Sequence, residues 1–154
     1  ILNLIKFLNN KNEKIIIITS PNFDNETKII KTEILNFTKK SDNVYFYKSL
    51  GNKGYLSFMK VAFLLVGNSS SGVLETPYFG TKTINIGNRQ KGRVLSDNII
   101  NSDYEFKSIL NAYKKIIKKP KKKSNIFLKK NTPVKMAKKI LSFSFNLKKE
   151  FYDL

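Results

Sequence analysis

Short apolar runs typical of strands alternate along this chain with longer segments whose apolar residues have helical spacing. The apolar runs predict strands at residues 15–19, 44–47, 63–66 and 83–86, and a short edge strand at 99–100. The other segments predict helices at residues 1–10, 26–40, 55–60, 104–118 and 134–147. Because alternating strands and helices favour parallel pairing with helices on both faces, we expect an α/β fold with a doubly wound, mostly parallel, Rossmann-like sheet.

The same patterns predict which segments are buried. The β-branched run Ile15–Thr19 is typical of a strand buried on both faces. Residues 49–53 contain a glycine, and we expect a loop there, before the short helix at 55–60. The last helix has a possible core face, formed by Met136, Ile140, Leu141 and Phe143. At 154 residues the chain is long enough for one domain with a substantial core.

Three polar loops follow predicted strands, at residues 21–25, 68–72 and 87–93. In open α/β sheets, ligands bind outside the carboxyl ends of the strands, where such loops meet. The chain has neither a Gly-x-Gly-x-x-Gly sequence nor a phosphate-binding glycine loop ending in Lys-Ser/Thr. The sequence therefore indicates a ligand site at this edge of the sheet, but not a classical dinucleotide fold or nucleoside triphosphatase.

The second of these loops combines small hydroxyl residues with a predicted helix start. Ser69, Ser70 and Ser71 can cap that helix, and its free backbone amides can instead receive a phosphate. Glu75 follows about one helical turn later, where a carboxylate can accept hydrogen bonds from two adjacent hydroxyls such as those of a ribose. An ordinary strand-to-helix turn, with capping serines and a solvated Glu75, is an equally good interpretation of this segment alone.

The third loop carries the only two arginines of the chain, Arg89 and Arg93. A guanidinium is a planar, bidentate donor suited to phosphate or to a base carbonyl. If the ligand is a nucleoside diphosphate sugar, we expect Ser69 and Ser70 to hold the pyrophosphate and Arg89 to add a polar clamp. A surface ion pair is the alternative for Arg89. Asn22 and Asp24, in the first loop, suit contacts to the base or sugar, or a turn-forming role.

Composition excludes some chemistries and leaves one alternative open. The chain has no cysteine and no histidine, so it offers no thiolate, no disulfide and no imidazole base or metal ligand. No apolar run approaches the ~20 residues of a membrane span, and a cytoplasmic protein is expected. The net charge of +18 comes mostly from lysines towards the C-terminal end. These lysines fit a solvated surface, or a patch for nucleic acid or an anionic membrane.

Two motifs together resemble the C-terminal domain of UDP-N-acetylglucosamine 2-epimerases, most closely the hydrolysing branch used in sialic and related nonulosonic acid biosynthesis. The motifs are Gly67-Asn68-Ser69-Ser70-Ser71-Gly72 with Glu75, and Ile84-Asn85-Ile86-Gly87-Asn88-Arg89-Gln90-Lys91-Gly92-Arg93. The segments Ser20–Asp24 and Tyr55–Ser57 are also similar to the family. The similarity runs from Ile15 to Gly92 and, more loosely, to Leu154.

The resemblance implies one half of a glycosyltransferase-B-like, two-domain fold that holds UDP between its domains. It implies UDP contacts from Ser69, Ser70, Glu75 and Arg89, with Asn22 and Lys28 as further nucleotide contacts. The implied reaction eliminates UDP from UDP-N-acetylglucosamine and hydrates the resulting glycal to N-acetylmannosamine, with no metal or redox cofactor. A different N-acetylated sugar is compatible with the same half.

The chain departs from the family pattern in what it lacks. The family's first domain supplies the acid and base carboxylates, a histidine and further arginines, and some relatives have a histidine where this chain has Ser49–Gly51. We therefore expect residues 1–154 to be a C-terminal nucleotide-binding domain without its N-terminal half, with no catalytic residues of its own and inactive alone. The expected partners are a UDP-sugar, the missing domain and further copies of the intact protein, not nucleic acid or a membrane. Another two-domain nucleotide-sugar enzyme, such as a glycosyltransferase, and a basic binding module for nucleic acid or a membrane surface are the alternatives.

Overall fold

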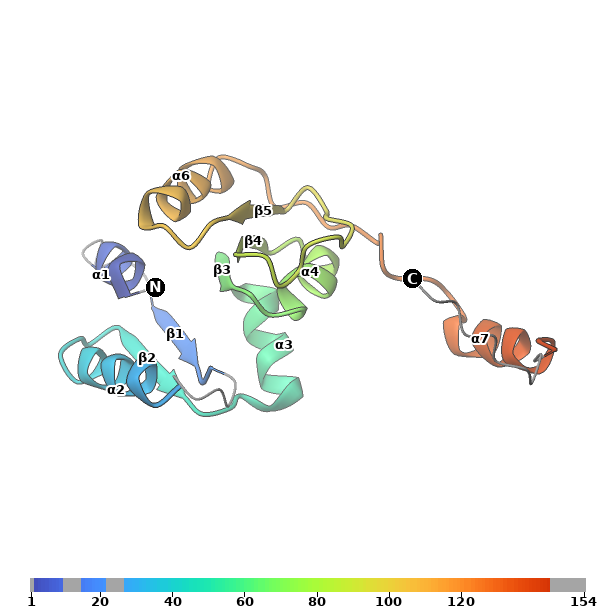
Figure 1. Cartoon of the computed structure of the whole chain (residues 1–154), viewed down its shortest axis with the longest axis horizontal. Coiled ribbons are helices and arrows are strands. Elements are labelled where there is room, and N and C mark those ends of the chain that lie inside the picture. The colour runs from blue at the N-terminus through green and yellow to red at the C-terminus, as the bar shows by residue number, and fades with distance from the viewer. Residues whose placement is uncertain (1, 10–14, 22–26, 145–154) are drawn as a thin grey trace, which may run out of the picture.

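The computed structural model describes residues 2–9, 15–21, 27–144 of the chain, and the account below concerns these residues. Helices and strands alternate as the sequence predicts (Figure 1). In chain order, the elements are α1 (Leu2–Asn9), β1 (Ile16–Thr19), α2 (Thr27–Thr38), β2 (Val44–Tyr47), α3 (Gly51–Val61), β3 (Leu64–Gly67), α4 (Ser71–Leu74), α5 (Thr76–Phe79), β4 (Lys82–Ile86), β5 (Ile99–Ser102), α6 (Phe106–Ile116) and α7 (Thr132–Leu141).

The strands pair in parallel within two small sheets, β1–β2 and β3–β4–β5. In the first sheet, Ile16 lies opposite Val44, and in the second, Leu64 lies opposite Lys82. The predicted α/β class and parallel pairing are therefore confirmed, and the arrangement is consistent with a doubly wound, Rossmann-like fold. The predicted edge strand at Ile99 and Ile100 is also confirmed, since β5 pairs with β4 on one side.

Helices cover both faces of the three-stranded sheet. Successive residues of β4 point to opposite faces, so Ile84 and Ile86 share one face while Thr83 faces the other way. On the first face, Ile84 and Ile86 form the main core with α6, through Ile109 and its neighbours. On the other face, the Thr83 hydroxyl lies 2.9 Å from the Thr76 hydroxyl of α5. The sheet thus carries α6 on one side and α4 with α5 on the other.

The glycine at position 72 lets α4 pack closely on the sheet. A Cβ at Gly72 would lie 3.1 Å from the Leu65 side chain and 3.3 Å from the Thr83 methyl group. Any larger residue would therefore push α4 away from β3 and β4. This close packing fixes the position of the serine-rich turn, which leads directly into α4.

Several local predictions are wrong. The helix predicted at 55–60 begins earlier, at Gly51, whose amide donates to the Ser49 hydroxyl at 3.1 Å. The strand at Ile15–Thr19 is not buried on both faces, because Ile15 and Thr19 are exposed and the three isoleucines between them are half-buried. The helix after the serine turn is two short helices, α4 and α5, and the second ends at Gly80 in the left-handed conformation.

The last helix also differs from the prediction. In Figure 1, α7 lies apart from the rest of the structure, at the end of an extended connection. Its possible core residues are all exposed, at 59% for Met136, 60% for Ile140, 86% for Leu141 and 57% for Phe143. The predicted amphipathic helix is present, but Met136, Ile140 and Leu141 are exposed rather than part of the core. No helix in the described ranges is both long and apolar enough to cross a membrane.

Candidate functional site

The serine-rich turn and the arginine loop begin side by side because of the strand register. Gly67, the last residue of β3, lies opposite Asn85 of β4. Since β3 and β4 are parallel, the segments that follow them emerge at the same edge of the sheet. The predicted convergence of the loops at 68–72 and 87–93 is therefore present.

A buried side chain joins these two loops. The amide nitrogen of Gln90 donates to the backbone carbonyl of Asn68 at 2.9 Å. Gln90 is only 4% exposed, although it lies in a polar loop between Arg89 and Lys91. Its side-chain oxygen is buried and has no hydrogen-bond partner within the described structure. Gln90 therefore fixes the distance between the arginine loop and the serine turn.

The serines of the turn are not used mainly for capping. Ser70 occupies the N-cap of α4, but its side chain makes no capping hydrogen bond. The Ser69 hydroxyl instead lies 3.0 Å from the Ser71 hydroxyl, which lies 2.7 Å from the hydroxyl of Tyr55 on α3. Ser69 and Ser70 are both exposed. Hydroxyl groups are thus presented at the surface where the two loops meet.

Glu75 lies at the junction of α4 and α5, close in sequence to the turn. Its backbone amide donates to the Ser71 carbonyl at 3.0 Å, and its side chain is exposed. The carboxylate makes no hydrogen bond or ion pair with any other residue that the structure describes. The next residue, Thr76, is fully buried and donates to the Gly72 carbonyl at 2.8 Å. A buried neighbour therefore holds the backbone of Glu75 while leaving its carboxylate open to a ligand.

The arginine loop is ordered by its own backbone. The amide of Lys91 donates to the Asn88 carbonyl at 2.9 Å, and the amide of Arg93 donates to the Gln90 carbonyl at 3.3 Å. Arg89 is exposed and has no acidic partner among the described residues. The ion-pair alternative for Arg89 thus finds no support in this part of the chain.

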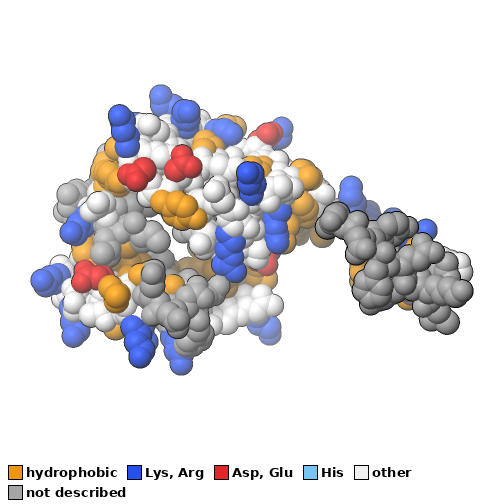
Figure 2. Space-filling view, viewed as in Figure 1, with side chains coloured by type: hydrophobic (Ala, Val, Ile, Leu, Met, Phe, Trp, Pro, Cys, Tyr) orange, Lys and Arg blue, Asp and Glu red, His pale blue; other side chains and the backbone are white. Residues whose placement is uncertain are grey.

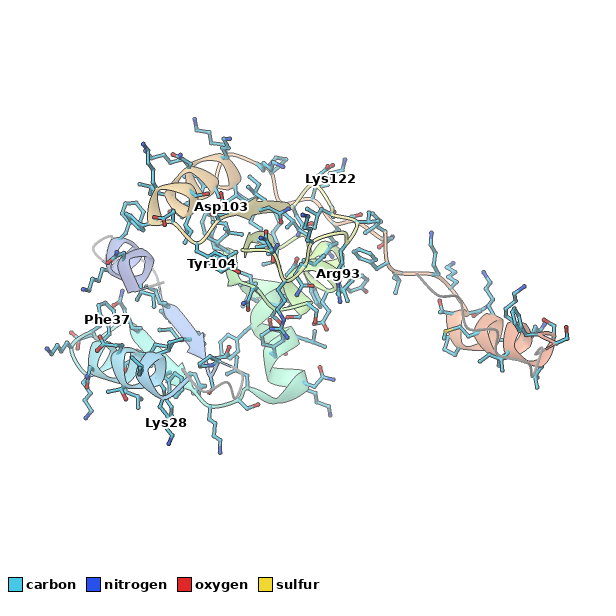
Figure 3. The ribbon with its side chains drawn as sticks, viewed as in Figure 1. Lys28, Phe37, Arg93, Asp103, Tyr104 and Lys122 are labelled. Carbon is cyan, nitrogen blue, oxygen red and sulfur yellow. The ribbon has the colours of Figure 1, made fainter. Side chains whose placement is uncertain are left out.

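The structure does not bring every predicted residue to this edge. Lys28 is exposed on α2, and Figure 3 shows it well apart from Arg93. Asn22 and Asp24 lie outside the described residues. A hollow of about 540 Å³ occurs elsewhere, between β5 and α6, beside Asn101, Asp103 and Lys107, and contains none of the predicted ligand residues. At the edge where the two loops meet, Ser69, Ser70, Glu75 and Arg89 are all exposed, so the candidate site is open in the described part of the chain.

Sequence reasoning assigned no role to Gln90 or Tyr55. Both were part of the family-like segments, but neither residue type nor spacing shows that they support the turn. The sequence does single out Gln90 in one respect, because it is the only glutamine in the chain. Its burial could not be inferred, because loops have no periodicity that separates inward from outward positions.

Comparisons with known proteins agree with this arrangement. The chain is 41% identical over 104 residues to the GDP/UDP-N,N'-diacetylbacillosamine 2-epimerase (hydrolyzing) of Campylobacter jejuni, covering 67% of this chain and 27% of that protein. It is 32% identical over 158 aligned positions to the polysialic acid biosynthesis protein P7 of Escherichia coli, covering 99% of this chain and 40% of that protein. It is 38% identical over 92 residues to the UDP-N-acetylglucosamine 2-epimerase of Neisseria meningitidis, covering 60% of this chain and 24% of that protein.

The chain thus spans between about a quarter and two fifths of the length of these relatives. The family model described as UDP-N-acetylglucosamine 2-epimerase matches residues 1–141, most of the chain and both loops of the candidate site. On this match, the chain belongs to the UDP-N-acetylglucosamine 2-epimerase family.

Proposed function

We propose that this chain is the C-terminal, UDP-binding half of a hydrolysing UDP-N-acetylglucosamine 2-epimerase. The observation that carries the proposal is the link from Gln90 to Asn68, which holds the serine turn and the arginine loop together at one edge of the sheet. Ser69 and Ser70 donate to the pyrophosphate, Glu75 accepts from the ribose hydroxyls, and Arg89 adds a bidentate donor. Asn22, outside the described residues, and Lys28, apart from this edge on α2, stay predictions from the family resemblance and are not part of this edge site.

The open shape of the site supports a second domain of the intact protein that completes it. All four residues assigned to UDP at this edge are exposed: Ser69, Ser70, Glu75 and Arg89. A second domain that closes over them would exclude water and strengthen each polar contact to the ligand. That domain supplies the acid and base for elimination of UDP and for hydration of the glycal to N-acetylmannosamine. Residues 1–154 alone bind UDP weakly and have no catalytic group.

The sugar is an N-acetylated one, either N-acetylglucosamine or a diacetylated relative of it. The relatives' names include both kinds of 2-epimerase. The intact protein is a cytoplasmic homo-oligomer in this proposal, with neither nucleic acid nor a membrane as a partner. Figure 2 shows Lys and Arg side chains at many places on the face in view, both around its outline and within it.

Titration with UDP tests the ligand assignment. Glu75→Ala removes the only carboxylate in the turn, and we expect it to abolish UDP binding while the unfolding transition is preserved. Glu33→Ala, which removes an exposed carboxylate from α2, is the matched control and should bind like the original chain. Equal UDP affinity in Glu75→Ala and Glu33→Ala would show that Glu75 does not hold the ribose.

The reaction is tested on the intact protein with UDP-N-acetylglucosamine. Release of UDP together with free N-acetylmannosamine supports the hydrolysing epimerase. Transfer of the sugar to an acceptor, with no free N-acetylmannosamine, would identify a glycosyltransferase of the same architecture instead.

A further inference from the structure

Three hydroxyl groups form a continuous row from the half-buried Tyr55 on α3 to the candidate site. The Tyr55 hydroxyl lies 2.7 Å from that of Ser71, which lies 3.0 Å from that of Ser69. Tyr55 and Ser71 are half-buried, and Ser69 is exposed at the outer end. The row therefore connects α3 to the surface of the turn.

The chemistry of the hydroxyls gives this row a direction when an anion is present. Each hydroxyl has one proton to donate and two lone pairs. If Ser69 donates to a phosphate oxygen, its own lone pair can accept from Ser71, whose lone pair can in turn accept from Tyr55. All three O–H bonds then point towards the anion, and each one polarises the next. A phenol suits the inner end, because it is a stronger donor than an aliphatic alcohol.

We propose that Tyr55 is a positioning residue for phosphate recognition, which orients the Ser69 hydroxyl through Ser71. This inference rests on the proposed UDP site and adds a residue that never touches the ligand. Ser70 is the contrasting case within the same turn, since it is exposed and makes no capping hydrogen bond. Tyr55 therefore controls the donor at Ser69 and not the one at Ser70.

The test is a set of double-mutant cycles read by UDP titration. Tyr55→Phe keeps the ring and removes only the hydroxyl, and we expect UDP affinity to fall about threefold to tenfold, as for one hydrogen bond. In a Ser69→Ala background, Tyr55→Phe should have no further effect, because its only path to the ligand is gone. In a Ser70→Ala background, the full effect of Tyr55→Phe should remain.

Tyr45→Phe is the matched control. It removes a hydroxyl on β2, in the two-stranded sheet, and this hydroxyl donates to the Asp42 carbonyl at 3.1 Å. We expect it to leave UDP affinity unchanged. Ser71→Ala, which breaks the middle of the row, should reproduce the loss seen with Tyr55→Phe.

The outcomes separate this inference from the function it rests on. If the unmodified chain binds no UDP, the proposed function is wrong, and so is the role of Tyr55. If the chain binds UDP but Tyr55→Phe has no effect on UDP affinity, only the positioning role of Tyr55 is wrong. That role is also wrong if Tyr55→Phe weakens UDP binding equally in the Ser69→Ala and Ser70→Ala backgrounds. A general displacement of the turn would then explain the loss.

Discussion

Replacing Gln90 by leucine separates loop positioning from stability. The substitution keeps a side chain of similar size and removes the 2.9 Å hydrogen bond to the Asn68 carbonyl. One such bond contributes about 0.5–1.5 kcal/mol to stability, and water can replace it because Asn68 is exposed. The substitution also removes the buried Gln90 oxygen that has no partner in the described structure, a group that costs about 1–3 kcal/mol. The two terms oppose each other, so the free energy of unfolding should fall by no more than about 0.5 kcal/mol and can rise by up to about 2.5 kcal/mol.

UDP affinity should nevertheless fall. Without the link, the serine turn and the arginine loop are no longer held at a fixed distance, and the ligand has to order them on binding. If the link contributes its full hydrogen-bond energy to this order, affinity falls by about twofold to tenfold.

Calorimetric titration with UDP and urea unfolding of the same Gln90→Leu preparation measure both quantities. Asn111→Leu, which changes an exposed amide on α6, is the control and should affect neither. Unchanged affinity at unchanged stability would refute the positioning role of Gln90. A loss of several kcal/mol in stability would refute the balance of the two hydrogen-bond terms.

Three further substitutions test the structure around the site. Thr76→Val removes a buried hydroxyl that bonds to Gly72, Thr83 and Asn98, and urea unfolding should show a loss of about 0.5–1.5 kcal/mol, because Thr83 and Asn98 keep the Thr81 carbonyl as a partner. Gly87→Ala forces a Cβ at φ +75° against the Tyr104 ring and should lower the unfolding midpoint more than Gly92→Ala, where φ is +83° and the space is open; equal losses would exclude a contribution from Tyr104. Arg89→Lys retains the charge and loses the bidentate geometry, and we expect weaker UDP binding with unchanged stability; unchanged UDP affinity would argue against the polar clamp.

The regular elements were predictable because their signals are local. The strand at Val44–Tyr47 was predicted with its observed bounds, since its β-branched and aromatic residues favour a strand wherever it lies. The start of α3 was missed because Gly51 and Gly54 are usually helix breakers. Packing outweighs that preference here, since α3 buries Met59 to 2% exposure.

The burial of whole elements was less predictable, because amphipathicity defines a face but not what covers it. The helix α7 has the apolar spacing of a core helix, and all of its residues are exposed. The strand β1 has the composition of a buried parallel strand, but its isoleucines are half-buried and β2 is its one neighbour among the described residues. In both cases the pattern correctly gives the secondary structure, and the covering partner depends on contacts distant in sequence that periodicity does not encode.

The candidate site divides in the same way. Ser69, Ser70, Glu75 and Arg89 could be proposed from sequence because ligand-facing groups have a recognisable chemistry at strand ends. The side chains that hold them, Gln90, Tyr55 and Thr76, act through hydrogen bonds to residues distant in sequence or to the backbone. Such contacts depend on which side chains the fold brings together, and a residue's type alone does not reveal them. In the proposed site, UDP binding therefore depends on the supports Gln90, Tyr55 and Thr76 as well as on the residues assigned to the ligand.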